Sequence, residues 1–147
     1  MTLQRDYPAG PLLAASICVL RGDRVLLATR TRPPMDNLYT LPGGLVEPGE
    51  TLAEAALREL HEEVGVTARV LGMIRPIEII QRDEAGAVRV HYVICAHAAL
   101  WVSGEPRPGP EAGAVIWADP AALSDLPTTP HLSEIVAGAG ALVRRQS

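Results

Sequence analysis

The spacing of apolar residues changes several times along the chain, and each change marks a predicted element. Residues 12–20 and 24–30 are rich in Val, Ile and Leu and are separated by a short Gly-Asp turn, which predicts a β-hairpin. Residues 66–81 and 87–102 are two longer segments of β-forming residues joined by a turn. Residues 114–119 predict one more short strand. We therefore expect a sheet with strands from both halves of the chain.

Helical spacing appears over residues 52–64, and both ends of this segment carry helix-boundary signals. Thr51 and Glu54 match a capping box, in which a hydroxyl and a carboxylate bond the unpaired backbone N–H groups of the first turn. Gly65 follows the last periodic apolar residue and supplies the left-handed conformation on which many helices end. The spacing therefore predicts one well-defined helix at about 52–64.

The C-terminal part of the chain predicts further helix. Residues 120–126 and about 131–145 have helical spacing, although Gly138 and Gly140 weaken the second segment. A mixed sheet covered by helices on both faces is the expected architecture, an α/β/α sandwich of the α/β class. We expect it to form a single domain over residues 1–147.

The predicted central helix has two unlike faces. At about 100° per residue, its apolar side chains form one stripe and three carboxylates share a separate sector. Like charges about 6 Å apart repel by about 0.7 kcal/mol in water and by about 3 kcal/mol at an effective dielectric of about 20. A hydrated surface tolerates this repulsion, whereas a cleft requires a cation such as Mg²⁺, which prefers carboxylate ligands. The stripe consists of Ala53, Leu57, Leu60 and Val64, and the acidic sector of Glu59, Glu62 and Glu63.

Composition narrows the class of protein. The 147 residues are 48% hydrophobic, and the net charge of -4 comes without any run of Lys or Arg. General nucleic-acid binding needs clustered cations, so no nucleic-acid partner is expected. No segment reaches the roughly 18 consecutive apolar residues that cross a bilayer. Cys18 and Cys95 lack CxxC partners and lie in apolar contexts typical of reduced core thiols. We therefore expect a cytoplasmic protein with no membrane partner.

One segment resembles a known motif. Its fixed positions are Gly44, Glu50 after five residues, Arg58-Glu59-Leu60 after seven, Glu62-Glu63 after one, and Gly65-Val66 after one more. This string resembles the Nudix box at every fixed and every aliphatic position. The hairpin before it and the strands and helix after it are also similar to the Nudix α/β/α sandwich. The resemblance implies a hydrolase of nucleoside diphosphates linked to another group.

The same resemblance implies roles for the residues of the motif. The three carboxylates Glu59, Glu62 and Glu63 are implied as ligands of Mg²⁺ or Mn²⁺, with help from the backbone carbonyl near Gly44. Arg58 is implied as the internal partner of the Glu50 side chain, fixing the loop against the helix. A bound cation would activate a water molecule for attack on phosphorus, so no covalent intermediate is required.

The general base is left open between two acids. In some family members the equivalent of Glu59 activates the water. Glu111 lies in a Pro/Gly-rich loop shortly before Trp117, similar to where the family often places an extra ligand or base. A hydrated loop acid explains Glu111 equally well, and Glu105 is a weaker candidate in the same loop.

Residues near the motif are candidates for binding the substrate. Gly43 and Gly44 allow a ligand or a metal to approach the backbone closely. Arg30 and Arg32 end the second predicted strand and could meet phosphates or ribose, although hydrated strand-end charges explain them as well. Tyr39 could stack on a base. Tyr92 is instead expected to pack in the core.

The substrate is less well determined than the chemistry. The pattern of the whole chain looks most like bacterial proteins assigned as ADP-ribose pyrophosphatases, although Pro76 follows the motif sooner than the proline common in that subgroup. Hydrolysis of nucleoside triphosphates such as oxidised dGTP is the nearest alternative. A non-catalytic nucleotide sensor is the third, and the retention of every acid in the motif argues against it. The partner is therefore a small-molecule nucleotide, and because dimers are common in the family, a homodimer is left open.

Overall fold

The computed structural model describes residues 4–32, 35–110 and 112–146. Every strand and helix predicted above is present, together with two short strands in the Pro/Gly-rich loop before the central helix. The strands are β1 (Leu12–Arg21), β2 (Arg24–Arg30), β3 (Tyr39–Thr40), β4 (Gly43–Leu45), β5 (Thr67–Arg82), β6 (Val88–Ser103) and β7 (Ala112–Ala118). The helices are α1 (Leu52–Val64), the 3₁₀ helix η1 (Pro120–Asp125) and α2 (Leu132–Gln146).

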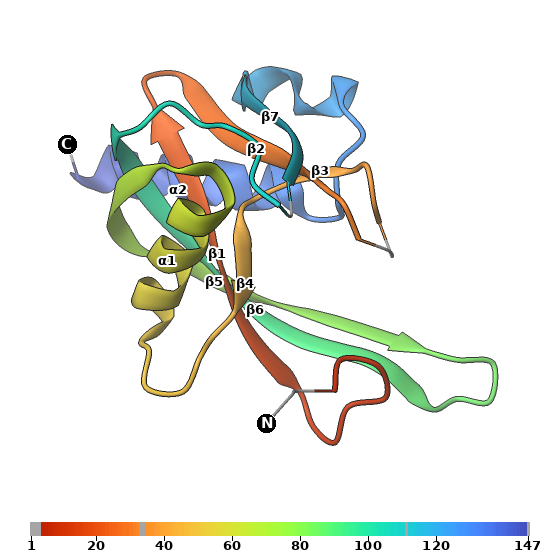
Figure 1. The fold of residues 1–147 in the computed structure, drawn as a ribbon. Helices are drawn as coiled ribbons and strands as arrows, with labels where there is room; N and C mark the ends of the chain where they lie inside the picture. The colour runs from red at the N-terminus through yellow and green to blue at the C-terminus, as the bar shows by residue number, and fades with distance from the viewer. Residues whose placement is uncertain (1–3, 33–34, 111, 147) are drawn as a thin grey trace.

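The strands form one mixed sheet in the order β3-β2-β1-β6-β5, with β7 beside β2. β1 runs parallel to β6, and the other pairings are antiparallel. β1 and β2 pair only near their turn, at Leu20 with Val25 and at Arg21 with Arg24. Farther from the turn, β4 takes the place of β2 beside β1. The two strands of the hairpin therefore diverge, and the glycine-containing strand β4 lies in the gap between them (Figure 1).

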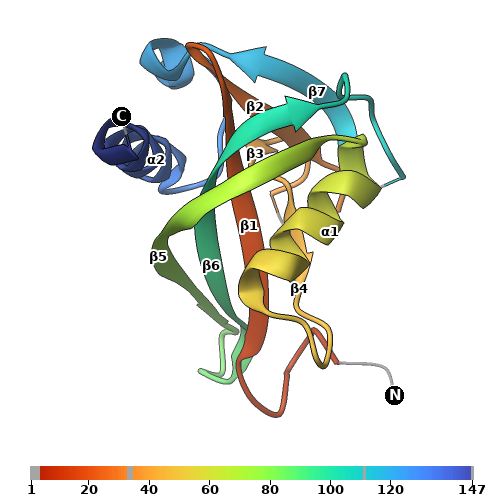
Figure 2. The same ribbon diagram turned by 90° about the vertical axis from the view of Figure 1, so that its left-hand side faces the viewer.

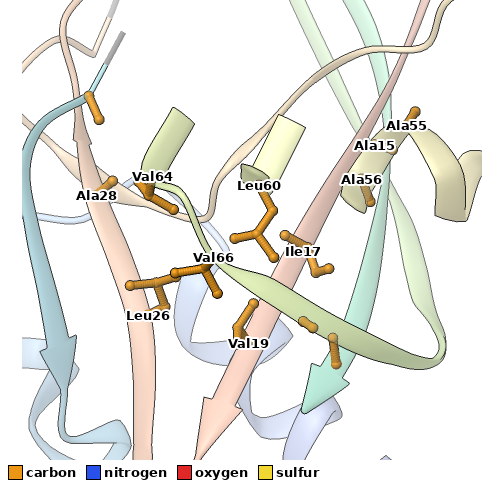
Figure 3. Packing of buried hydrophobic residues seen from close by; sticks show 13 residues of the cluster. Ala15, Ile17, Val19, Leu26, Ala28, Ala55, Ala56, Leu60, Val64 and Val66 are labelled. Atoms are coloured by element: carbon orange, nitrogen blue, oxygen red, sulfur yellow. The ribbon is translucent and has the colours of Figure 1, made fainter. Parts of the chain in front are cut away.

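The two long helices cover opposite faces of the sheet, as Figure 2 shows. Alternate residues of β1 supply the two cores: Ile17 and Val19 pack with Leu60 and Val64 of α1 (Figure 3). Cys18 points to the other face and packs in the cluster beneath α2. This arrangement confirms the predicted α/β/α sandwich.

The ends of α1 are formed as predicted. The Thr51 hydroxyl accepts a hydrogen bond from the Glu54 N–H at 3.1 Å, and the Glu54 carboxylate accepts one from the Thr51 N–H at 2.9 Å. Gly65 ends the helix with φ of 74° and donates its N–H to the carbonyl of His61 at 2.9 Å. Local sequence is therefore sufficient to define both boundaries of this helix.

The buried face of α1 differs from the predicted stripe. Leu60 and Val64 are buried as expected, but Ala55 and Ala56 are fully buried beside them, whereas Ala53 and Leu57 are only partly buried. Two adjacent small side chains let the helix lie close to β1, which favours this rotation over one centred on the bulkier leucine. The rotation brings part of the acidic sector toward β4.

Both cysteines are buried and unpaired, as their apolar contexts predicted. Burial raises the pKa of the Cys18 thiol to about 12, because the thiolate would lose its hydration. None of the helices among the described residues has the length and the apolar composition that a membrane-spanning helix needs.

Candidate active site

The centre of the site is the contact between β4 and the acidic sector of α1. A Cβ at Gly44 would lie 2.5 Å from Cδ of Glu59, and a Cβ at Gly43 would lie 2.6 Å from the carbonyl oxygen of Ala15. The Gly43 N–H also donates a long hydrogen bond of 3.4 Å to the carboxylate of Glu63. Gly43 therefore requires glycine, because a side chain there would meet the backbone of β1, whereas a side chain at Gly44 would displace the Glu59 carboxylate.

Arg58 connects α1 to the loop that precedes it. Its guanidinium donates to both carboxylate oxygens of Glu50, at 2.7 and 3.0 Å, and to the carbonyl of Leu45 at 3.1 Å. The same group donates to Glu59 at 2.9 Å and to Glu62 at 3.2 Å. Two-point pairing with a carboxylate uses the planar shape of guanidinium, so the loop is held in a defined position on the helix.

The pairing changes the protonation equilibria of both groups. Hydrogen bonds from Arg58 lower the pKa of the Glu50 carboxyl, and a hydrogen bond from the Glu47 N–H acts in the same direction. The pKa of Arg58 is raised, first by its hydrogen bonds to Glu50 and then by those to Glu59. Arg58 therefore remains a cation between the carboxylates at all ordinary pH values.

The three glutamates of the acidic sector, Glu59, Glu62 and Glu63, are not equivalent. The side chain of Glu59 is only 14% exposed and lines a cleft together with Glu63. Glu62 is 60% exposed, is bonded to Arg58 and does not line that cleft. Thus the rotation of α1 turns two of the predicted metal ligands inward and leaves the third at the rim.

The donor atoms of the site are of the kinds that a hard dication binds. Carboxylate oxygens and the backbone at Gly44 are the ligand types that Mg²⁺ and Mn²⁺ prefer, and the three atoms nearest to a Cβ built at Gly44 all belong to the Glu59 carboxylate. Among the described residues, however, no three His, Cys, Asp or Glu side chains are gathered closely enough to hold a metal ion as they stand. The donors therefore fit the cation in kind, while Glu62 is bonded to Arg58 and does not line the cleft with Glu59 and Glu63.

The cleft has a volume of about 830 Å³ and two unlike flanks. Its centre is the contact of Gly43 and Gly44 with the two inward glutamates. The flank toward β2 is polar and consists of Thr29, Arg30, Thr31 and Arg32. The flank toward β5 and α2 is largely apolar and contains Ile77, Ile79, Tyr92, Ile94, Leu132 and Ile135.

The residues predicted to bind substrate fall into two groups. Arg30, Arg32, Gly43 and Gly44 all line the cleft. Tyr39 does not: it packs in the apolar cluster on the α2 face, and its N–H donates to the carbonyl of Pro127 at 2.8 Å.

The two loop acids have different outcomes. Glu111 lies outside the described residues, so its candidacy as ligand or base stays a prediction. Glu105 forms an ion pair with Arg21 at 3.0 Å and does not line the cleft.

The sequence analysis did not predict the residues of the apolar flank as part of a binding site. Tyr92 was expected in the core, yet it is only partly buried and lies in the cleft beside Ile94. Alternation along the strands does place Ile77, Ile79, Tyr92 and Ile94 on one face of the sheet. Only the position of α2, which leaves this end of the face open, shows that they line a cleft.

A second cleft, of about 520 Å³, lies between η1, α2 and the β1–β2 turn. Its lining includes Leu20, Val136 and Ala137, and none of the three glutamates of the acidic sector of α1 lines it. The chemistry predicted from the motif therefore belongs to the larger cleft.

A model of the NUDIX domain matches residues 10–138. The chain belongs to the Nudix family. This Nudix chain is 30% identical over 102 residues to the ADP-ribose pyrophosphatase of Methanocaldococcus jannaschii, covering 69% of its own length and only 58% of that relative. It is 34% identical over 116 residues to a Mycobacterium tuberculosis protein named as an 8-oxo-dGTP diphosphatase, an assignment that is itself provisional; the alignment covers 76% of each chain.

The fold of this Nudix chain is also found among solved structures. The NUDIX domain of Shewanella oneidensis NrtR, crystallised with ADP ribose, superposes with a TM-score of 0.74 at 21% identity, covering 94% of this chain and 90% of that one. At this level of identity the likeness concerns the fold, namely the mixed sheet between helices.

Proposed function

We propose that this Nudix protein is a pyrophosphohydrolase dependent on Mg²⁺ or Mn²⁺, which cleaves a nucleoside diphosphate linked to a second group, with ADP-ribose as the favoured type of substrate. The observation that carries the proposal is the contact of Gly44 with the Glu59 carboxylate at the centre of a cleft with two flanks. The names of the family relatives support the reaction class.

Different residues of the site have different proposed roles in the reaction. Glu59, Glu62 and Glu63 would hold the cation together with the Gly44 carbonyl, and the bound cation would neutralise the diphosphate and lower the pKa of a water molecule. Arg58 holds Glu59 in place through its 2.9 Å hydrogen bond. If Glu59 instead accepts the proton of the attacking water, Glu62 and Glu63 remain as the carboxylate ligands. Glu111 is the alternative proton acceptor.

The sheet register supports a substrate that extends to both sides of the diphosphate. Leu45 of β4 pairs with Ala14 of β1, Ala14 with Ile94 of β6, and Ile94 with Ile77 of β5. Three strand spacings of about 4.8 Å place Ile77 about 14 Å from β4. That span suits a nucleoside on the apolar flank, with Tyr92 available for stacking.

The opposite flank supports the second group of the substrate. Arg30 and Arg32 provide positive charge and Thr29 and Thr31 provide hydroxyls, which suit a ribose phosphate. A nucleoside triphosphate has no second sugar beyond its phosphates, so the hydroxyls of the polar flank would have no ribose to bind. This argument favours ADP-ribose, the ligand in the NrtR crystal structure. The M. tuberculosis relative supports 8-oxo-dGTP as the second candidate.

The test is a comparison of kcat/KM for ADP-ribose, other nucleotide sugars and 8-oxo-dGTP with Mg²⁺ or Mn²⁺ present. We expect AMP and ribose phosphate as products and the highest kcat/KM for ADP-ribose. A higher value for 8-oxo-dGTP would replace the favoured substrate and keep the reaction class. No hydrolysis of any of these compounds would contradict the proposed function.

Glu62→Gln tests the metal assignment, because Glu62 is exposed and its replacement should not disturb the core. We expect a loss of Mn²⁺ affinity, measured by electron paramagnetic resonance, and a fall in kcat of at least about tenfold. Glu134→Gln is the matched control. Glu134 lies on α2, outside the site, is similarly exposed, and forms an ion pair with Arg75 at 2.7 Å. Equal kcat and Mn²⁺ affinity in both variants would remove Glu62 from the site.

A further inference from the structure

The loop of residues 104–110, here called the proline strap, lies over the C-terminal end of α1. Its sequence places Pro106, Pro108 and Pro110 at alternate positions. Each proline fixes its own φ and restricts the residue before it to extended conformations, so the strap is stiff. A stiff segment loses little entropy when it is held against a neighbour.

The strap is anchored at its start. The Trp101 indole N–H donates to the carbonyl of Gly104 at 2.8 Å. Glu105 pairs with Arg21 at 3.0 Å, and the Arg21 guanidinium carbon lies 3.7 Å from the centre of the Trp101 ring. These contacts tie the beginning of the strap to the ends of β1 and β6.

The middle of the strap contacts the helix end directly. The Arg107 N–H donates to the carbonyl of Val64 at 3.1 Å, which satisfies one of the carbonyls left unpaired at a helix C-terminus. The Arg107 guanidinium lies beside Gly65, where a cation is favoured by the helix dipole. Gly109 packs against the backbone of Glu63, and a Cβ at Gly109 would collide with the Glu63 carbonyl oxygen.

We propose that the proline strap positions the last turn of α1, and that Gly109 is a positioning residue for Glu62 and Glu63. The inference rests on the proposed metal-dependent hydrolysis, since it concerns how those carboxylates are held for the cation. The last turn of a helix is the part that frays most readily. Because the prolines prevent the strap from bending locally, a side chain at Gly109 must lift the strap from the helix.

Gly109→Ala is the test, with Gly10→Ala as the control, because a Cβ at Gly10 would have no atom within 4 Å. In Gly109→Ala we expect amide hydrogen exchange over residues 61–66 to accelerate about tenfold without metal. We also expect Mn²⁺ affinity, measured by electron paramagnetic resonance, to fall about tenfold, and kcat to fall more than KM changes. Gly10→Ala should match the wild type in all three measurements.

The outcomes separate this inference from the proposed function. A folded Gly109→Ala protein with wild-type exchange and Mn²⁺ affinity would overturn the strap proposal alone. A wild-type protein that binds no Mn²⁺ would overturn the proposed function and the inference with it. If Gly109→Ala does not fold, Arg107→Ala is the second test, because it removes the guanidinium beside Gly65 and keeps the backbone bond to Val64. We expect faster amide exchange over residues 61–66 and lower Mn²⁺ affinity, both by less than in Gly109→Ala. Wild-type values of both would overturn the proposal.

Discussion

At the scale of single residues, Arg58 is the side chain that joins the motif into one unit. It is 22% exposed and bonds Glu50 in the loop, Glu59 toward the cleft and Glu62 at the rim. Two-point pairing with Glu50 satisfies one side of the guanidinium and leaves the other for the helix acids. Arg58 therefore orients the loop and Glu59 together.

Replacing Glu50 tests this pairing through the pH dependence of stability. The pKa of Glu50 is lowered from its ordinary 4.5 by the hydrogen bonds from Arg58. A lowered pKa adds stability above the unfolded-state pKa, and this stability is lost as the pH falls through the folded-state value. We expect urea unfolding to show Glu50→Gln less stable than wild type at neutral pH, with the difference shrinking below pH 4.5.

Glu84→Gln is the control for this experiment, because Glu84 is exposed in the turn between β5 and β6. It should leave the free energy of unfolding within about 0.5 kcal/mol of wild type at neutral pH. A Glu50→Gln destabilisation that stayed constant from neutral pH to pH 3 would show that the ion pair is not its source.

At the scale of elements, α1 is held at both ends by different means. Its first turn is closed by the Thr51–Glu54 capping box, which is built from neighbours in sequence. Its last turn is closed by Gly65 and by the Arg107 N–H from a distant loop. The helix end with the carboxylates thus depends on tertiary contact more than the other end does.

Thr51→Ala tests the local end. Loss of the hydroxyl leaves the Glu54 N–H without its acceptor, and we expect the free energy of unfolding to fall by about 1 kcal/mol in urea titrations. Because the lost bond is remote from the helix end that carries Glu62 and Glu63, kcat should stay near the wild-type value. Ser124→Ala is the control, because Ser124 in η1 also has an exposed hydroxyl. An equal fall in the free energy of unfolding in Ser124→Ala would show that the Thr51 cap has no specific stabilising role.

At the scale of the whole molecule, β1 and β2 diverge and α2 covers only part of one sheet face (Figures 1 and 2). The cleft is lined by residues of β1, β2, β4 and α2, so these two features of the fold leave it open. Ala14, Ala15 and Ser16 are small β1 residues that line it. Small side chains there keep the centre of the cleft continuous with the apolar flank.

Ala14→Leu tests this continuity. The larger side chain should obstruct the apolar flank, so KM for a nucleoside diphosphate substrate should rise by about tenfold or more, while Mn²⁺ affinity in the absence of substrate stays unchanged. Ala137→Leu adds the same volume in the second cleft and should leave both constants at wild-type values. Unchanged KM in Ala14→Leu would place the nucleoside elsewhere.

The sequence alone determined the features whose causes are local. The bounds of α1, its capping box and its glycine stop follow from contacts within a few residues. The pairing of Arg58 with Glu50 was implied by the resemblance to the Nudix box, and it is present in the structure. The motif also indicated which glutamates belong together.

Only the tertiary structure decided which faces of these elements pack against one another and which residues line the cleft. Three features depend on segments far apart in the chain: the rotation of α1 toward Ala55 and Ala56, the place of Tyr92 in the cleft, and the contact of Gly109 with Glu63. The packing of Tyr39 against the cluster on the α2 face is a fourth. Periodicity shows that two faces of an element differ, but the packing of distant partners selects which face is covered.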